Sequence, residues 1–285
     1  MADPNGKGRL LLSARDVNVS FEVSNGIVEA VRDLNLDIFA GETLALVGES
    51  GSGKSAFAKS ILDMHQPPFT RRRCVIQGDI EYHRASGVLQ LVGADGKTMR
   101  AVREKEIGMI FQDAMSSLNP VIRLGKQVYE ALSYVPIDPS SRWLKVSGIL
   151  DEVGLGGKRY ARSFPHQLSG GQRQRAMIAI AAVRTPSLLI ADEPTTALDV
   201  TVQAQILSLL KRVQASSNMS MLFITHDLGV VHDVAERVAV MCAGRIVELG
   251  NVSQVFRDPQ HAYTKSLLEN RPGPTRKRKA RVATA

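Results

Sequence analysis

The first fifty residues alternate between apolar and polar positions in short runs that turn-forming residues interrupt. Pairs such as Asn25–Gly26 and Ala40–Gly41 separate the runs. The pattern predicts a small antiparallel sheet of four short strands, over Leu10–Ser13, Val17–Val23, Ile27–Val31 and Leu34–Ile38. The next run, Thr43–Val47, is apolar and leads into a glycine, which is typical of a strand buried in a parallel sheet.

The middle of the chain changes from strand-like to helix-like patterning. Residues 54–64 predict a helix, and strands follow over Val75–Tyr82 and Val88–Val92. The polar stretch 84–100 contains three glycines and predicts a loop insertion. After a buried strand over Ile107–Phe111, residues 113–184 are mainly helical, with helices predicted over Leu124–Val135, Ser141–Val153 and Gly171–Val183.

Strands and helices alternate again after Pro186. The predicted strands are Ser187–Ala191, Met219–Thr225, Val238–Met241 and Arg245–Leu249, and the predicted helices are Val200–Ala215, with Asp199 placed to cap it, and Leu228–Ala235. Such alternation implies a parallel sheet covered by helices. The sequence therefore predicts an α/β fold: a mostly parallel core, an antiparallel β part and an inserted helical part.

Composition and charge are those of an ordinary globular chain. Of 285 residues, 44% are apolar and 22% are charged, which excludes a fibrous or wholly disordered protein. The net charge of +8 is concentrated after Glu269, where six basic residues occur without an acidic one; the remaining 30 basic and 28 acidic residues leave +2. We predict a folded body over 10–270 that does not bind nucleic acid, and a disordered basic tail over 271–285.

Disulfides and membrane spans are not expected. Two cysteines, Cys74 and Cys242, cannot form a disulfide framework or a cysteine metal cluster, and reduced cytosolic thiols are expected. The N-terminus is polar and lacks the apolar region of a signal peptide. The longest apolar runs are far shorter than the roughly 18 residues that suggest a membrane span.

A phosphate-binding loop is predicted directly after the strand Thr43–Val47. Its eight residues match the pattern G-x-x-x-x-G-K-[ST] between a strand and a helix, and they are Gly48, Glu49, Ser50, Gly51, Ser52, Gly53, Lys54 and Ser55. Glycines let successive backbone N–H groups point into one anion-binding concavity, and the helix N-terminus adds positive potential. Lys54 can reach the β- and γ-phosphates, and Ser55 can bind Mg²⁺.

Two acidic residues end the strand that precedes Pro194. Ligand sites of open parallel sheets lie where strands end. Asp192 is therefore predicted to hold Mg²⁺ through water, and Glu193 to polarise the water that attacks the γ-phosphate.

A second glycine-containing helix start follows Leu168. Ser169, Gly170, Gly171 and Gln172 combine an N-cap serine with an unobstructed helix N-terminus, which is a second anion site. Since one nucleotide does not need two such sites from one chain, this one is assigned to a nucleotide held by another subunit. The alternative is a capped helix with a permissive turn.

Together and in this order, the three motifs resemble the nucleotide-binding subunit of ATP-binding cassette (ABC) transporters, over roughly residues 10–270. The resemblance implies roles for four further residues. Gln112 matches the glutamine that contacts Mg²⁺ and senses the membrane partner, Asp199 the loop that crosses the dimer interface, and His226 the histidine that contacts the γ-phosphate. Phe21 is assigned to stacking on adenine; the alternative is a core strand residue.

Two segments resemble the importers of oligopeptides, dipeptides and nickel within that family. They are residues 111–120, around Asn119–Pro120, and residues 258–268, which resemble a C-terminal helix. Many peptide-importer subunits continue into a cysteine-rich tail, whereas this chain ends in basic residues, so we expect no iron–sulfur cluster. Peptide, nickel and other small solutes stay open as cargo.

The resemblance implies an ATPase that uses ATP and Mg²⁺ to power uptake. Its implied partners are transmembrane permease subunits, a second ATPase subunit that is identical or related, and indirectly a solute-binding protein. The implied location is peripheral, on the cytoplasmic face of the inner membrane. The alternatives are an ABC ATPase of DNA repair or translation, which long coiled-coil insertions or a second cassette would favour, and an exporter subunit.

Overall fold

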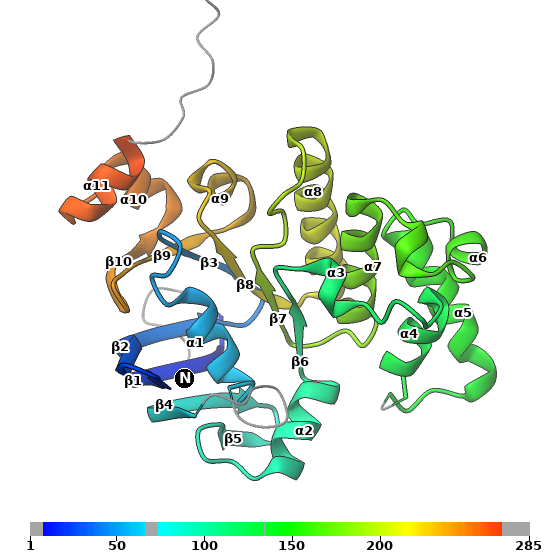
Figure 1. The fold of residues 1–285 in the computed structure, drawn as a ribbon, viewed down its shortest axis with the longest axis horizontal. Coiled ribbons are helices and arrows are strands. Elements are labelled where there is room, and N and C mark those ends of the chain that lie inside the picture. The colour runs from blue at the N-terminus through cyan, green and yellow to red at the C-terminus, as the bar shows by residue number, and fades with distance from the viewer. Residues whose placement is uncertain (1–7, 66–72, 134, 270–285) are drawn as a thin grey trace, which may run out of the picture.

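The computed structural model describes residues 8–65, 73–133 and 135–269 (Figure 1). Its strands are β1 (Leu10–Val23), β2 (Gly26–Phe39), β3 (Thr43–Val47), β4 (Cys74–Arg84), β5 (Gly87–Gln90), β6 (Ile107–Ile110), β7 (Leu188–Asp192), β8 (Ser220–Thr225), β9 (Arg237–Cys242) and β10 (Arg245–Asn251). Its α-helices are α1 (Lys54–Ile61), α2 (Gly96–Lys105), α3 (Ala114–Ser117), α4 (Leu124–Ala131), α5 (Pro139–Glu152), α6 (Gly157–Tyr160), α7 (Gly170–Ala182), α8 (Val200–Ser217), α9 (Leu228–Val234), α10 (Val252–Arg257) and α11 (Ala262–Glu269). The basic tail predicted over 271–285 lies outside the described residues.

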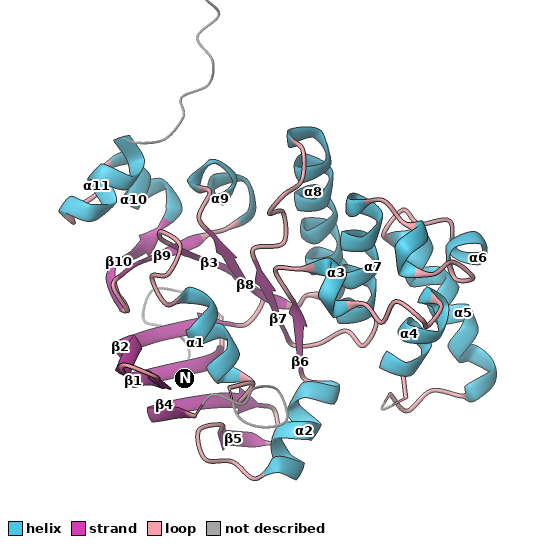
Figure 2. Cartoon of the chain, viewed as in Figure 1, coloured by secondary structure: helices cyan, strands magenta, loops and turns pink. Residues whose placement is uncertain are grey.

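The strands form two sheets (Figure 2). One is antiparallel, in the order β2-β1-β4-β5. The other has the order β10-β9-β3-β8-β7-β6, in which only β10 runs antiparallel to its neighbour. Helices α3 to α7 occupy the chain between β6 and β7. The predicted α/β class, with a mostly parallel core and an antiparallel β part, is confirmed.

The first two strands are longer than predicted. Each was expected as two short strands, but β1 and β2 each continue for 14 residues through an irregularity near Asp16 and Asp33. Both aspartates have a left-handed backbone, with φ of 48° and 45°. Aspartate tolerates this conformation, and a bulge places an extra residue in a strand without ending it. The polar interruption of the pattern therefore marks bulges rather than turns.

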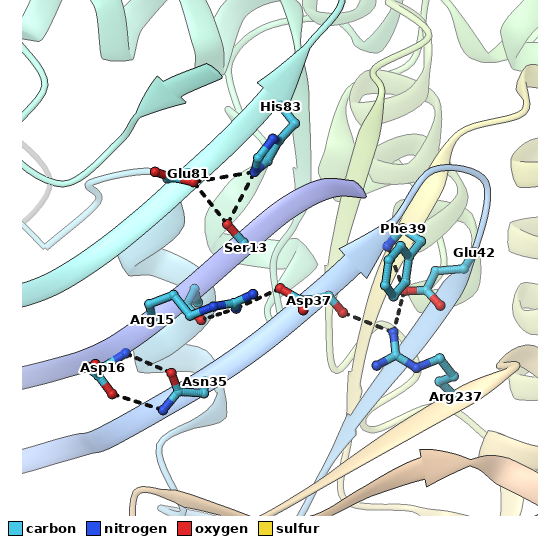
Figure 3. Close-up of polar contacts among 11 residues, drawn as sticks. Ser13, Arg15, Asp16, Asn35, Asp37, Phe39, Glu42, Glu81, His83 and Arg237 are labelled. Atoms are coloured by element: carbon cyan, nitrogen blue, oxygen red, sulfur yellow. Dashed lines mark hydrogen bonds and ion pairs between the residues drawn. The ribbon is translucent and has the colours of Figure 1, made fainter. Parts of the chain in front are cut away.

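Side-chain contacts stabilise the first bulge (Figure 3). The backbone N–H of Asp16 donates to Asn35 Oδ1 at 3.1 Å, and Asn35 Nδ2 donates to Asp16 Oδ1 at 3.2 Å. The extra residue on β1 is thus hydrogen-bonded to β2, and the pairing resumes beyond it.

The loop predicted over 84–100 is wrong in its last five residues. Residues from Gly96 onward form α2, whose N-cap Asp95 accepts hydrogen bonds from the N–H groups of Lys97 and Thr98. Met99 and Val102 are buried on its inner face. The helix has few apolar residues, so its buried face is narrow, but the Asp95 cap is a start signal present in the sequence.

Alternate residues of the central strands face opposite sides of the six-stranded sheet. Leu188 and Ile190 of β7 pack in the cluster that includes α1 and the antiparallel sheet. Leu189 and Ala191 pack in the cluster that includes α7 and α8. Helices α1 and α7 therefore cover opposite faces of this sheet, as Figure 1 also shows.

A buried arginine connects the two sheets. Arg237 of β9 is 8% exposed and donates to the Asp37 carbonyl of β2 at 3.1 Å and to Glu42 Oε1 at 2.9 Å (Figure 3). Its guanidinium also lies 5.2 Å from the centre of the Phe39 ring. Charge-assisted hydrogen bonds of this kind are stronger than neutral ones, so Arg237 fixes the end of β2 to the parallel core.

Among the described residues, no helix combines the length and the apolar character needed to cross a bilayer.

Phe57 of α1 tests the packing that joins the two sheets. Its side chain is fully buried in the shared core. We expect Phe57→Ala to lower the free energy of unfolding by about 3–5 kcal/mol, because it leaves a cavity between the sheets. Urea denaturation followed by circular dichroism measures the change. An effect below about 1 kcal/mol would show that α1 is not anchored there.

Candidate functional site

The strand register brings the predicted site residues to one edge of the parallel sheet. Val47 of β3 pairs with Thr225 of β8, and Ile224 of β8 pairs with Asp192 of β7. Ile110 of β6 pairs with Ala191 of β7. The residues that follow these strands therefore leave the same edge: the phosphate loop, Glu193, His226 and Gln112. Ligand sites of open parallel sheets lie at this edge.

The phosphate loop needs glycine at both ends. Gly48 has φ of 153°, and a Cβ there would lie 2.1 Å from the Met241 carbonyl oxygen. Gly53 has φ of 106° and caps α1; a Cβ there would lie 2.1 Å from the Ala30 carbonyl oxygen. Gly51, with φ of 81°, turns the exposed middle of the loop between Ser50 and Ser52. No other residue type fits at Gly48 or at Gly53, because the loop lies against the backbones of β2 and β9 there.

Lys54 is buried beneath this loop. Its Nζ donates to the carbonyl oxygens of Gly48 at 2.8 Å and Glu49 at 2.7 Å, and to Ser52 Oγ at 3.3 Å. Burial lowers the pKa of Lys54, and the carboxylates of Glu193 and Asp192 partly offset that effect. The loop thus holds an ammonium group out of water, where its attraction to phosphate is strengthened.

Ser55 and Asp192 contact each other directly. Ser55 Oγ, in the first turn of α1, donates to Asp192 Oδ1 at 2.8 Å. Asp192 is 2% exposed, and burial raises its pKa although the Ser55 hydrogen bond lowers it. A hydroxyl and a carboxylate are oxygen ligands of the kind that Mg²⁺ prefers, and a cation would offset the desolvation of Asp192. The residues therefore fit a magnesium site.

Glu193 is held by three side chains from different segments. Gln112 Nε2 donates to Oε2 at 2.9 Å, Thr196 Oγ1 donates to Oε2 at 2.8 Å, and His226 Nδ1 lies 3.1 Å from Oε1. The Glu193 backbone is left-handed, with φ of 47°, and its N–H donates to the Ile224 carbonyl at 3.0 Å. This backbone turn aims the side chain along the sheet edge instead of into the core.

The two adjacent acids have pKa values shifted in opposite directions. Burial is the largest influence on Glu193 and raises its pKa, but hydrogen bonds from Thr196 and His226 and the charge of Lys54 outweigh it, so the pKa lies below its ordinary value. Glu193 is therefore ionised at neutral pH and can accept a proton. Asp192 differs because burial dominates there.

Phe21 lies near the first turn of α1. Its ring packs edge-on against His65, with centroids 4.9 Å apart, and His65 Nε2 is 2.7 Å from the Ala56 carbonyl oxygen. Ala56 follows Ser55 in α1. Phe21 is half-buried and packs against the core cluster that includes α1, so part of its ring serves the core and part is exposed.

The second predicted anion site lies apart from the first, because α7 and α1 cover opposite faces of the sheet. Ser169 and Gln172 form a reciprocal capping box at the start of α7. Gly170 is open, with no atom closer than 3.7 Å to an added Cβ, whereas a Cβ on Gly171 would lie 2.7 Å from Val202 Cγ1. Asp199 caps α8 as predicted, by accepting from the Val202 N–H at 2.9 Å.

At each of these two sites, sequence reasoning missed a side chain that holds a predicted residue in place. Thr196 holds Glu193, and Tyr160 accepts a hydrogen bond from Gln172 Nε2 at 2.9 Å. Thr196 lies three residues after Glu193, a spacing that permits a hydrogen bond across a turn. Tyr160 has no comparable local signal.

Comparison with known proteins places this geometry in a family. A family model described as ABC transporter matches residues 31–196. The oligopeptide transport ATP-binding protein OppD of Lactococcus lactis subsp. lactis is 44% identical over 264 residues, which cover 92% of this chain and 76% of the relative. The OppD of Bacillus subtilis is 48% identical over 92% of this chain and 72% of its own. The dipeptide transport ATP-binding protein DppD of Bacillus subtilis is 45% identical over 92% of this chain and 77% of its own.

Solved structures agree. A dimeric ATP-binding cassette, MJ0796 bound to ADP and Pi, has a TM-score of 0.72 and 26% identity, and the match covers 85% of this chain and 99% of that one. CbiO1 of Clostridium perfringens, part of the transporter complex cbiONQ, has a TM-score of 0.72 and 26% identity over 88% and 92%. This chain belongs to the ABC transporter family, in which it is the subunit that binds and hydrolyses ATP.

Proposed function

We propose that this chain powers the uptake of peptides through a membrane permease. Sequence identity of 44–48% to transport proteins for oligopeptides and dipeptides favours peptide as the cargo over nickel or another small solute. The hydrolytic step rests on one observation, the Glu193 carboxylate held by Gln112, Thr196 and His226 at the edge of the sheet.

Each residue of this edge has a distinct task in hydrolysis. The loop N–H groups and Lys54 bind the phosphates. Glu193 orients the attacking water and accepts its proton, while His226 and Gln112 keep the carboxylate in place. Phe21 stacks on adenine. Ser55 and Asp192 would hold Mg²⁺. Because Gln112 Nε2 donates to Glu193, Gln112 would contact the cation through its amide oxygen. When bound, Mg²⁺ neutralises charge on the phosphates.

The role of Glu193 as general base predicts the behaviour of Glu193→Gln. The amide keeps the shape and most hydrogen bonds of the carboxylate but cannot accept a proton. We expect ATP binding to persist and hydrolysis to fall about 10²–10⁴-fold. Phosphate release and ATP titration measure the two quantities. Hydrolysis near the rate of the unmodified chain would remove Glu193 from this role.

The second anion site supports a head-to-tail dimer. Lys54 and Ser169 lie on helices that cover opposite faces of one sheet, so one nucleotide cannot contact both within a chain. In the proposed dimer, which is formed with an identical or a related subunit, each ATP lies between Lys54 of one chain and Ser169 of the other. The dimeric state of the MJ0796 cassette is consistent with this arrangement.

Gly170→Asp tests the dimer more cleanly than a change at Gly171, where Val202 of the same chain leaves no room. Gly170 is open within the chain, so the carboxylate should act only on a nucleotide that the other subunit holds. Repulsion of the γ-phosphate should abolish hydrolysis and leave ATP binding by the isolated chain unchanged.

Gly148→Asp is the matched control, because Gly148 lies on an exposed part of α5 with no atom within 4 Å of an added Cβ. It should hydrolyse ATP normally. Loss of ATP binding in the Gly170→Asp chain alone would place the segment in the same-chain site and contradict the dimer.

A groove between α4, α5 and α6 supports the permease as partner. It measures about 660 Å³, and Trp143, Leu144 and Ala161 give it apolar surface. Four cations also line it, namely Arg123, Lys126, Lys158 and Arg162, and within the described part of the chain none of its lining residues is acidic. Trp143 and Leu144 are 53% and 77% exposed. An amphipathic helix with acidic residues matches such a groove in shape and charge.

We therefore assign the groove to a cytoplasmic helix of the permease. In this proposal the helical part, about 113–184, transmits movement between Gln112 and the membrane partner, and the permease holds the chain at the cytoplasmic membrane face. A solute-binding protein delivers the cargo to the permease.

Reversal of one groove charge tests this partner. Lys158 is exposed, so Lys158→Glu should leave ATPase activity of the isolated chain intact. Binding to the permease in detergent should weaken roughly two- to fivefold at low salt, and the difference should shrink as salt screens the contact. Lys97→Glu, at an exposed site on α2, is the matched control. Equal loss in both variants would move the permease away from this groove.

A further inference from the structure

One peptide group of the phosphate loop is held from both sides. The peptide that joins Gly48 to Glu49 contributes the Gly48 carbonyl, which accepts from Lys54 Nζ at 2.8 Å. Its N–H belongs to Glu49 and donates to the hydroxyl oxygen of Tyr263 at 3.1 Å. In a planar trans peptide the C=O and N–H point in opposite directions. Lys54 and Tyr263 therefore hold opposite edges of the same plane.

Tyr263 comes from the C-terminal helix, 214 residues after Glu49. The turn that leads into α11 is fixed on β10, since the Glu248 carboxylate accepts from the N–H groups of Gln260 at 2.8 Å and His261 at 3.1 Å. Tyr263 and Leu267 pack against the core cluster that includes Val47 of β3 and Val240 of β9. The hydroxyl is thus presented by an anchored helix and not by a free side chain.

The position of this peptide determines where the Lys54 ammonium group lies. Rotation of the plane would release the Glu49 N–H and turn the Gly48 carbonyl away from Lys54. The loop cannot move toward β9 to compensate, because the Gly48 Cα already lies against the Met241 carbonyl. Burial raises the pKa of Tyr263, so its hydroxyl stays neutral where it accepts from the Glu49 N–H.

We propose that Tyr263 is a positioning residue for ATP binding: through the Gly48–Glu49 peptide, the C-terminal helix α11 sets the place of Lys54. The proposal rests on the ATPase function. It makes α11 a structural part of the nucleotide site, although α11 contributes no group to the phosphates.

Tyr263→Phe tests the proposal because it removes only the hydroxyl. The ATP dissociation constant, measured with a fluorescent ATP analogue, should rise about three- to tenfold, as expected for one hydrogen bond. In a chain that also carries Lys54→Ala, Tyr263→Phe should change the ATP dissociation constant less than about twofold, because the ammonium group that Tyr263 positions is absent. A general structural role of Tyr263 would weaken binding equally in both backgrounds.

Tyr129→Phe, on α4, is the matched control and should leave ATP binding unchanged. Thermal unfolding verifies that each variant is folded. A Tyr263→Phe chain that binds ATP as tightly as the unmodified chain overturns the proposal, and so does equal weakening with and without Lys54. Failure of the unmodified chain to bind ATP would instead contradict the ATPase function.

Discussion

The parallel pairing of β3, β8 and β7 determines where every reacting group can lie. Lys54, Asp192 and His226 come from segments that are far apart in the chain, yet each follows or ends one of these three strands. A shift of one residue in the pairing of β7 with β8 would turn each side chain of β7 to the opposite face of the sheet. It would also separate Asp192 from Ser55. The chemistry of the site therefore depends on sheet register before it depends on any single side chain.

Two neighbouring carboxylates at this edge of the sheet lie in different environments. Asp192 ends β7 inside the sheet, where burial raises its pKa above its ordinary value. Glu193 has a left-handed backbone, and hydrogen bonds outweigh its burial, so its pKa lies below its ordinary value. Environments that shift adjacent acids in opposite directions give them different roles. In the proposed function, one peptide bond separates the residue that would hold the cation from the residue that accepts the proton.

Local signals predicted the buried strands, the phosphate loop and the capped helices, because glycine spacing, apolar runs and Asp199 act within a few residues. The same signals failed to predict the bounds of elements where a polar residue lies inside a strand or begins a helix. Asp16 and Asp33 are bulges inside continuous strands, and Asp95 caps a helix that has few apolar residues. Tyr160 and Tyr263 could not be found this way. Their partners are 12 and 214 residues distant, and only the folded sheet brings the second pair together.

The position of β3 also has a consequence for how the chain acquires its fold. This strand is complete by residue 47, but its two neighbours in the sheet, β8 and β9, begin at Ser220 and Arg237. A strand that is buried on both faces and paired on both edges must wait for most of the chain to be synthesised. Such distant pairings raise the contact order and slow folding. The nucleotide site thus assembles late, and an unfinished chain exposes an apolar strand with two open edges.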